Sequence, residues 1–114
     1  MATDQELIIQ AVRDYFGGWY DADAARMDRA LHPGLARRSP AEDDGAILTK
    51  ELMLQARAEG EGARAANRQV KIGTADACGA IASAVVHPAP YREYLHLIRT
   101  GDGWKIGDAL WLPR

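Results

Sequence analysis

Apolar side chains near the start of the chain recur at the spacing of a helix with a wide apolar stripe. They are Leu7, Ile8, Ala11, Val12, Tyr15, Phe16 and Trp19. Thr3 precedes Glu6 by three residues, as in a capping box, so the start of the helix is also specified. The pattern predicts a helix over residues 3–20 that lies on a sheet. Gly17 and Gly18, near its end, either loosen the last turn or let another backbone come close.

Two shorter helices are predicted after the first one, each with a polar residue at its start. Asp23 is placed to cap a helix over residues 24–31, and His32-Pro33-Gly34 would end it because proline cannot continue a helix. Thr49 is placed to cap a third helix over residues 50–59. Its inward-facing residues would be Leu52, Met53 and Ala56.

The second half of the chain changes to the period of two that is typical of strands. Val70 and Ile72 alternate with polar neighbours, and turn-forming residues recur at 76–79 and 100–103. We expect a short strand over residues 35–39 and four antiparallel strands, which begin near Val70 and then cover residues 80–87, 91–99 and 104–112. Helices followed by antiparallel strands form an α+β layout, here as a single domain over residues 1–114.

The third of these strands is apolar on both of its faces. Leu95 and Leu97 share one face, and the other face carries Tyr94, His96 and Ile98. An antiparallel sheet with one face in water alternates apolar and polar residues instead. We therefore expect one face to cover the first helix and the other to meet a second copy of the chain in a homodimer.

The last predicted strand carries an acidic residue, Asp108, at a position that its alternation places in the interior. By strict alternation Asp108 shares the interior face with Trp104 and Ile106, while Trp111 points to the other face. An interior carboxylate would have a raised pKa and could act as a general acid or base. Alternatively, Gly107 forms a bulge that turns Asp108 outward.

Composition and charge narrow the classes of function. The chain has 114 residues and a formal net charge of −2, which gives no bulk attraction to nucleic acid or to an anionic membrane. No apolar run approaches the roughly 20 residues of a membrane span. Its one cysteine, Cys78, cannot form an internal disulfide and is typical of a reducing compartment, so we expect the cytoplasm.

Several stretches resemble the nuclear-transport-factor-2-like superfamily of cystatin-like, cone-shaped α+β proteins, and within it the group labelled "putative lumazine-binding" and the SnoaL-like proteins. The matching stretches are residues 12–16 with Asp23, 31–33, 91–97, 103–106 and Trp111. The resemblance implies a curved antiparallel sheet covered by the N-terminal helices. It also implies a pocket between the first helix and the concave face of the sheet, and dimers packed through sheet surfaces.

The ketosteroid isomerases of this superfamily offer a comparison of activity. In them a tyrosine on the first helix and a protonated aspartic acid form the oxyanion hole, and a second aspartate moves the proton. Tyr15 matches the tyrosine position. The base position falls near Arg38 or Ser39 and the second acid falls near Leu95, none of which suits its role. The resemblance therefore does not imply steroid isomerase activity.

Five residues are the candidates for a ligand site: Tyr15, Trp19, His32, Trp104 and Asp108. Tyr15 would donate a hydrogen bond to a ligand carbonyl, or else bond the backbone within the core. His32 is a candidate for acid–base chemistry, or else it caps the last carbonyls of the second helix. Tyr15, His32 and Asp108 are also the candidates for catalysis.

Other common sites have no counterpart in the sequence. His32, His87 and His96 share no metal-ligand spacing with one another or with Cys78, so no metal site is predicted. His96 is expected to pack in the dimer interface. The sequence also has no glycine-rich phosphate loop and no Ser-His-Asp arrangement, so no cofactor is predicted.

Three functions are consistent with these observations. The first is a dimeric domain that binds a small, partly apolar molecule without assigned catalysis. The second is an isomerase, dehydratase or cyclase that uses Asp108 or His32 as base and Tyr15 as electrophile. The third is an interaction module whose interior is filled by its own side chains. The orientation of Asp108 and the state of the interior distinguish them.

Overall fold

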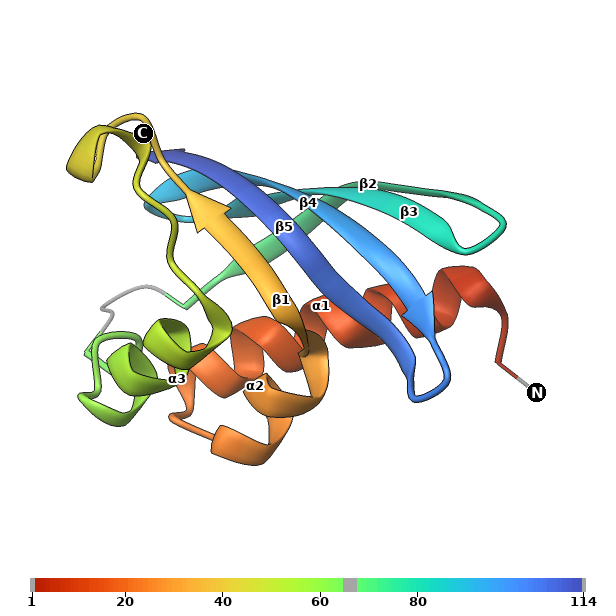
Figure 1. Cartoon of the computed structure of the whole chain (residues 1–114), viewed down its shortest axis with the longest axis horizontal. Coiled ribbons are helices and arrows are strands. Elements are labelled where there is room, and N and C mark those ends of the chain that lie inside the picture. The colour runs from red at the N-terminus through yellow and green to blue at the C-terminus, as the bar shows by residue number, and fades with distance from the viewer. Residues whose placement is uncertain (1, 65–67, 114) are drawn as a thin grey trace.

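The computed structural model describes residues 2–64 and 68–113 of the chain. Its elements, in chain order, are α1 (Asp4–Tyr20), α2 (Ala24–Ala30), β1 (Leu31–Arg38), the 3-10 turn η1 (Asp43–Gly45), α3 (Lys50–Ala58), β2 (Val70–Cys78), β3 (Ile81–Pro88), β4 (Tyr91–Thr100) and β5 (Gly103–Pro113). The α+β class predicted from the sequence is confirmed (Figure 1).

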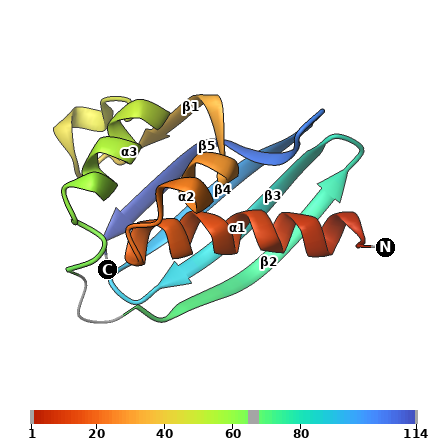
Figure 2. The same cartoon turned by 90° about the horizontal axis from the view of Figure 1, so that it is seen from below.

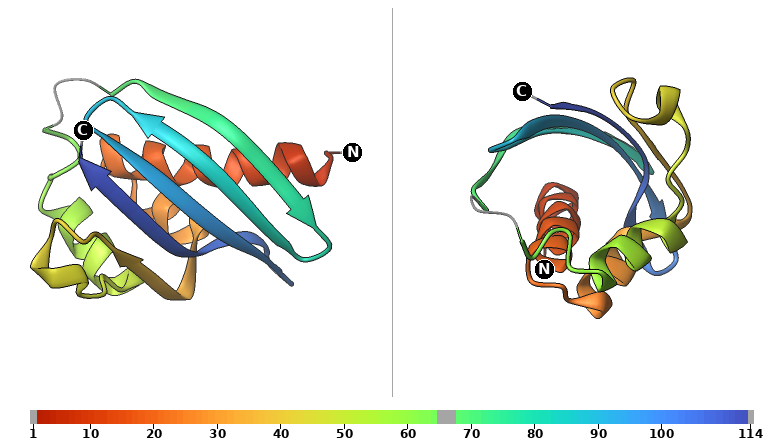
Figure 3. Two further views of the ribbon diagram at one scale, coloured as in Figure 1. Left: turned by 90° about the horizontal axis from the view of Figure 1, so that it is seen from above. Right: turned by 90° about the vertical axis from the view of Figure 1, so that its left-hand side faces the viewer.

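The strands form one curved sheet in the order β1-β5-β4-β3-β2. Neighbouring strands are antiparallel, except that β1 runs parallel to β5. α1 lies against the concave face and crosses the strands at an angle (Figure 2). The right-hand view of Figure 3 shows the sheet curving around α1. In that view α2 and α3 lie at the side that the sheet leaves open. This is the helix-on-curved-sheet architecture expected above.

α1 begins where its capping pattern predicts. Thr3 is the N-cap, and its Oγ1 accepts a hydrogen bond from Glu6 N at 3.2 Å. The helix buries Ile8, Val12 and Phe16 against the sheet, as the apolar stripe predicts. Leu7 is a correction to that stripe, because it lies at the stripe's edge and remains 45% exposed.

The backbones of α1 and α2 pack closely together at Gly18. A Cβ atom on Gly18 would lie 2.6 Å from Met27 N, so only glycine allows the two helices to pack this closely. This agrees with the expectation that the glycine pair admits a neighbouring backbone. Met27 itself is fully buried between the helices and the sheet.

The structure corrects several predicted boundaries and orientations. β1 starts at Leu31, earlier than residue 35, because an edge strand with a shifted register tolerates Pro33. β2 continues to Cys78 rather than turning from residue 76. In α3 Met53 is buried, but Leu52 points outward and is 45% exposed.

Strand β4 has the two faces that its alternation predicts. Leu95 and Leu97 are buried on the inner face, while Tyr94, His96 and Ile98 are exposed on the outer face.

None of the described helices is both long and apolar enough to span a bilayer.

An ion-pair cluster also fixes α2 against α1. Asp14, on α1, accepts hydrogen bonds from Arg26 Nε at 3.2 Å and from Arg29 Nε at 3.3 Å. Burial alone would raise the pKa of Asp14, but the hydrogen bonds from Arg29, Arg26 and Gln10 outweigh it, so the pKa lies below its ordinary value. The ionised form of Asp14 is therefore more stable in the folded protein than in the unfolded chain.

We expect Asp14→Asn to lower the free energy of unfolding at pH 7 by about 1–2 kcal/mol, since both arginines are partly exposed. Because the pKa of Asp14 is lower in the folded protein than in the unfolded chain, its ionisation stabilises the fold at pH values above the ordinary pKa of an aspartate. This stabilisation is lost as the pH falls through the pKa of the folded state. The loss measured by urea unfolding should therefore shrink toward acid pH. Asp28→Asn is the matched control and should change stability little, because the Asp28 side chain is 66% exposed in its pair with Lys50. An Asp14→Asn deficit that stayed constant with pH would contradict this assignment.

Candidate functional site

A buried ion pair joins two strands on the inner face of the sheet. Arg37 Nε, from β1, donates a hydrogen bond to Glu93 Oε2, from β4, at 2.7 Å. Arg37 is 8% exposed and Glu93 is completely buried. Between the two strands runs β5, so the pair bridges across a whole strand.

Tyr15 completes this cluster from the helix side. Its hydroxyl donates to Glu93 Oε2 at 3.3 Å, which ties α1 to β1 and β4 at one point. Burial raises the pKa of Tyr15, so the phenol stays protonated and remains a donor. Burial also raises the pKa of Glu93, with Arg37 opposing that shift. Glu93 Oε1 is buried and has no hydrogen-bond partner among the described residues.

Aromatic rings hold the other side of the guanidinium. Arg37 Cζ lies 4.8 Å from the centroid of the Trp111 ring and 6.0 Å from that of Tyr91. The two rings meet edge to face with centroids 5.5 Å apart. A guanidinium placed over an aromatic face is attracted by the ring's quadrupole. Arg37 is therefore fixed in both position and orientation.

A cavity of about 740 Å³ opens beside Arg37 and the two rings. It lies between the end of α1, α3 and the ends of β1, β4 and β5, and its lining includes Trp19, Arg37, Ser39, Leu48, Met53, Tyr91 and Trp111. The indole Nε1 of Trp111 is buried and has no hydrogen-bond partner among the described residues. The volume is within the usual range for small-molecule sites, and the N–H-bearing side chains of Arg37 and Trp111 are part of its wall.

Only two of the five predicted site residues belong to this region. Trp19 lines the cavity. Tyr15 reaches the region through Glu93, although its own side chain lies behind the cavity wall in the core. His32, Trp104 and Asp108 lie elsewhere in the fold.

Asp108 lies outside the cone because of a bulge. The register of β4 and β5 shifts between the pairs His96–Asp108 and Leu97–Ile106, which leaves Gly107 as the extra residue. Asp108 therefore faces outward, where its Oδ1 lies 2.8 Å from His96 Nδ1. The same shift corrects the orientation of Trp111, which faces the interior opposite Glu93 rather than the outer surface.

His32 and Trp104 are also held away from the cavity. His32 Nδ1 accepts a hydrogen bond from Gly34 N at 2.9 Å near the start of β1. Trp104 Nε1 donates to Asp4 Oδ1 at 3.3 Å, at the opposite end of α1 from Trp19. The structure thus does not bring these two residues together with Tyr15. Among the described residues, no group of three His, Cys, Asp or Glu side chains could hold a metal ion.

Arg37 and Glu93 are the important residues that the sequence interpretation missed. The signal was present in the alternation of both strands, because Glu93 precedes the buried Leu95 by two residues and Arg37 follows the buried Leu35 by two. Two opposite charges at interior positions of different strands indicate a buried pair. The acid beside Tyr15 is therefore Glu93, one inner-face position before Leu95.

Comparison with solved structures defines the class of fold. An NTF-2-like protein of unknown function from Silicibacter pomeroyi DSS-3 superposes with a TM-score of 0.82 at 15% identity, covering 99% of this chain and 100% of that one. An NTF2-like protein of unknown function from Methylobacillus flagellatus KT gives 0.79 at 17% identity, covering 100% and 95%. A ketosteroid isomerase-like protein from Erwinia carotovora atroseptica gives 0.71 at 14% identity, covering 99% and 98%. The chain has the NTF2-like, cystatin-like fold.

The family within that fold is shown by the sequence. Residues 3–112 match the family described as "Putative lumazine-binding", and the chain belongs to this family. No curated protein matches the chain at a significant level. The resemblance noted from the sequence is thereby confirmed over nearly the whole chain.

Removing one partner of the buried pair tests the cluster. Glu93→Gln leaves the Arg37 charge buried without a counter-charge, and we expect it to lower the free energy of unfolding by about 3–5 kcal/mol. The double variant Arg37→Met/Glu93→Met removes both charges and should recover most of that loss. Urea unfolding at pH 7 measures both variants. A double variant less stable than Glu93→Gln would contradict the cluster as described.

Proposed function

We propose that the chain is a small-molecule-binding domain whose ligand occupies the cavity beside Trp19, Arg37 and Trp111. The observation that carries the proposal is the pairing of a ligand-sized cavity with donors at its wall. Arg37 uses Nε for Glu93, and a guanidinium has four further N–H groups. The buried indole N–H of Trp111 lacks an acceptor among the described residues. A ligand that supplies an acceptor would satisfy it.

The walls indicate the chemistry of the ligand. Trp19, Tyr91 and Trp111 offer flat apolar surfaces, and Arg37 and Trp111 both carry N–H groups that can donate hydrogen bonds to a ligand. These groups fit a flat ring system that carries a carbonyl or anionic oxygen. The family description points to lumazine, a fused heteroaromatic ring with carbonyl oxygens. That description supports the same class of ligand.

An acid–base enzyme is the second candidate, and one observation favours it. Glu93 has a raised pKa and contacts Tyr15, a combination that suits proton transfer. His32 and Asp108 lie outside this region, so the base in such an enzyme would be Glu93. Glu93 is completely buried behind Arg37, however, and a ligand in the cavity would meet Arg37 first. Binding without catalysis is therefore the first proposal.

Lumazine binding, measured by isothermal titration calorimetry, tests the first proposal with a matched pair of variants. Trp111→Phe keeps an aromatic ring but removes the indole N–H, and we expect it to weaken binding about tenfold, the loss of one buried hydrogen bond. Trp104→Phe makes the same change at the far end of α1 and should leave affinity unchanged. Absence of lumazine binding, or equal losses in the two variants, would refute this ligand and this cavity.

The outer face of the sheet supports a homodimer as part of the proposal. Large apolar side chains are exposed across it, namely Ile81, Tyr94, Ile98, Leu110 and Leu112. A groove of about 620 Å³ beside Pro40 adjoins three of them. Monomeric proteins rarely expose contiguous apolar patches of this kind. Two copies packed face to face would cover both patches.

Sedimentation equilibrium tests the dimer directly. The wild-type protein is expected at twice its chain mass of 12.4 kDa. Leu110→Lys, at the middle of the apolar face, should shift it to the monomer because an unpaired charge is costly to bury. Leu7→Lys changes an equally exposed leucine on α1 and is expected to leave the dimer intact. A monomeric wild-type protein would contradict this part of the proposal.

A further inference from the structure

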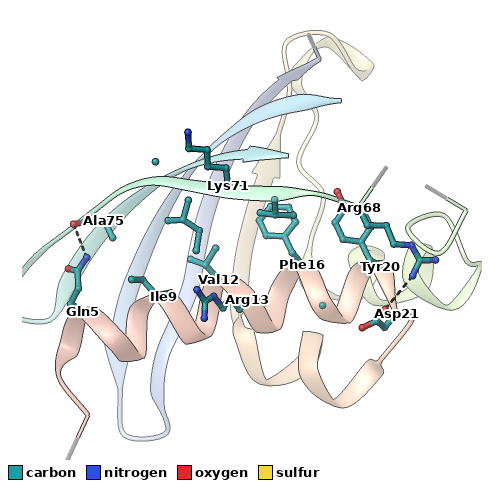
Figure 4. A pocket seen from close by; sticks show the side chains of 14 residues that line it. Gln5, Ile9, Val12, Arg13, Phe16, Tyr20, Asp21, Arg68, Lys71 and Ala75 are labelled. Carbon is teal, nitrogen blue, oxygen red and sulfur yellow. Dashed lines mark hydrogen bonds and ion pairs between the residues drawn. The ribbon is translucent and has the colours of Figure 1, made fainter. Parts of the chain in front are cut away.

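A second cavity lies between α1 and the edge strand β2 (Figure 4). Its volume is about 660 Å³, and it shares no lining residue with the first one. Gln5 Nε2 donates to Ala75 O at one end, and Arg68 donates to Asp21 Oδ1 at the other, both at 3.4 Å. The helix and the strand are thus joined at both ends of an open groove.

The helical wall of this groove is made of two parallel ridges of residues four apart. The inner ridge is apolar except for one hydroxyl and comprises Val12, Phe16 and Tyr20. The outer ridge carries Ile9 and then Arg13. Val70 and Ile72 supply the apolar wall on the strand side. The groove therefore has an apolar floor along its length and a cation at its rim.

Tyr20 carries the polar group that calls for a ligand. It is 6% exposed, and its hydroxyl is buried with no hydrogen-bond partner among the described residues. Burial raises the pKa of Tyr20, so at neutral pH the hydroxyl is a donor. Figure 4 shows the Tyr20 ring beside Arg68, at the end of the groove.

The charge around the groove is positive although the whole chain carries a net charge of −2. Its lining contains Arg13, Arg68 and Lys71 against one carboxylate, that of Asp21. Arg13 forms no ion pair with another described residue through its side chain. Lys71 points away from the helix in Figure 4, so Arg13 and Arg68 are the cations nearest the opening.

We propose that this groove binds a monocarboxylic acid with an apolar body. Its carboxylate accepts hydrogen bonds from the Tyr20 hydroxyl and from Arg68, and its body lies along Phe16 and Val12 toward Ile9. A hydroxyl and a guanidinium together suit a carboxylate, whereas a neutral apolar ligand would leave the Tyr20 hydroxyl without an acceptor. This site is separate from the cavity of the proposed function and does not depend on it.

A small molecule fits the groove better than an added β-strand does. β2 is the free edge of the sheet, but Lys71 and the register shift between Ile72 and Thr74 both interrupt it. Charged residues and bulges on an edge strand discourage pairing with another chain. The unpartnered group of the site is also a side-chain hydroxyl, not a backbone amide.

Decanoate is a suitable probe, with decan-1-ol as its neutral counterpart. We expect decanoate to shift the backbone amide resonances of α1 and of β2 around Ile72 in the full chain. Tyr20→Phe and Arg68→Gln should each weaken decanoate binding about tenfold, as loss of a hydrogen bond to a charged group implies. Arg68→Gln should leave decanol binding unchanged. Arg92→Gln, on the exposed outer face of β4, is the control and should bind decanoate as the wild type does.

Several outcomes would overturn the proposal. One is the absence of decanoate binding, and another is binding that neither Tyr20→Phe nor Arg68→Gln weakens. A third is a set of shifts centred on the Trp19 and Trp111 indoles, which would place the acid in the first cavity. The Arg68 side chain is 46% exposed, so its variant tests the site even where Tyr20→Phe alters folding. Lumazine binding can succeed or fail independently of these results.

Discussion

The interior of this fold depends on one buried ion pair, that of Arg37 with Glu93. An arginine keeps its proton in any protein environment, so its burial requires a partner charge. Glu93 provides that charge from β4, and Tyr15 bonds the same carboxylate oxygen from α1. Edge strand β1, central strand β4 and the main helix therefore meet at one carboxylate. Such a pair adds little to net stability, but it ties the three elements together at one point.

The same constraint shapes the first cavity. Arg37 Nε is bonded to Glu93, and its Cζ lies 4.8 Å from the centroid of the Trp111 ring. The Arg37 side chain held in this way forms part of the cavity wall, together with residues of α3. The two cavities differ in character. One is aromatic, with donors at its wall, and the other is a narrow apolar groove with a basic rim.

Local rules were sufficient for the helices and for most of the strands. Thr3, Asp23 and Thr49 all act as the N-caps that the sequence predicts, because capping depends only on neighbouring residues. The orientation of Asp108 and Trp111 could not be settled in this way. One extra residue at Gly107 reverses the alternation, and strict alternation has no means of registering it.

The candidate site was harder to predict for a different reason. Trp19 lines the first cavity, but the ion pair beside that cavity joins residues from β1 and β4, which are far apart in the sequence. Each charge alone resembles an ordinary surface residue. Only the pairing of β1 with β5, a parallel contact that the sequence did not suggest, brings Arg37 within reach of Glu93. One signal of the pair was available in the sequence, namely that Arg37 and Glu93 each fall at an interior position of their strand's alternation.

A crystal structure of the purified protein would show both the buried pair and the contents of the cavity beside it. We expect it to show Arg37 bonded to Glu93 beside Trp111, with electron density for a bound compound that touches the Trp111 indole nitrogen. A cavity closed by Trp19 and the side chains of α3, with Arg37 turned to solvent, would contradict this expectation.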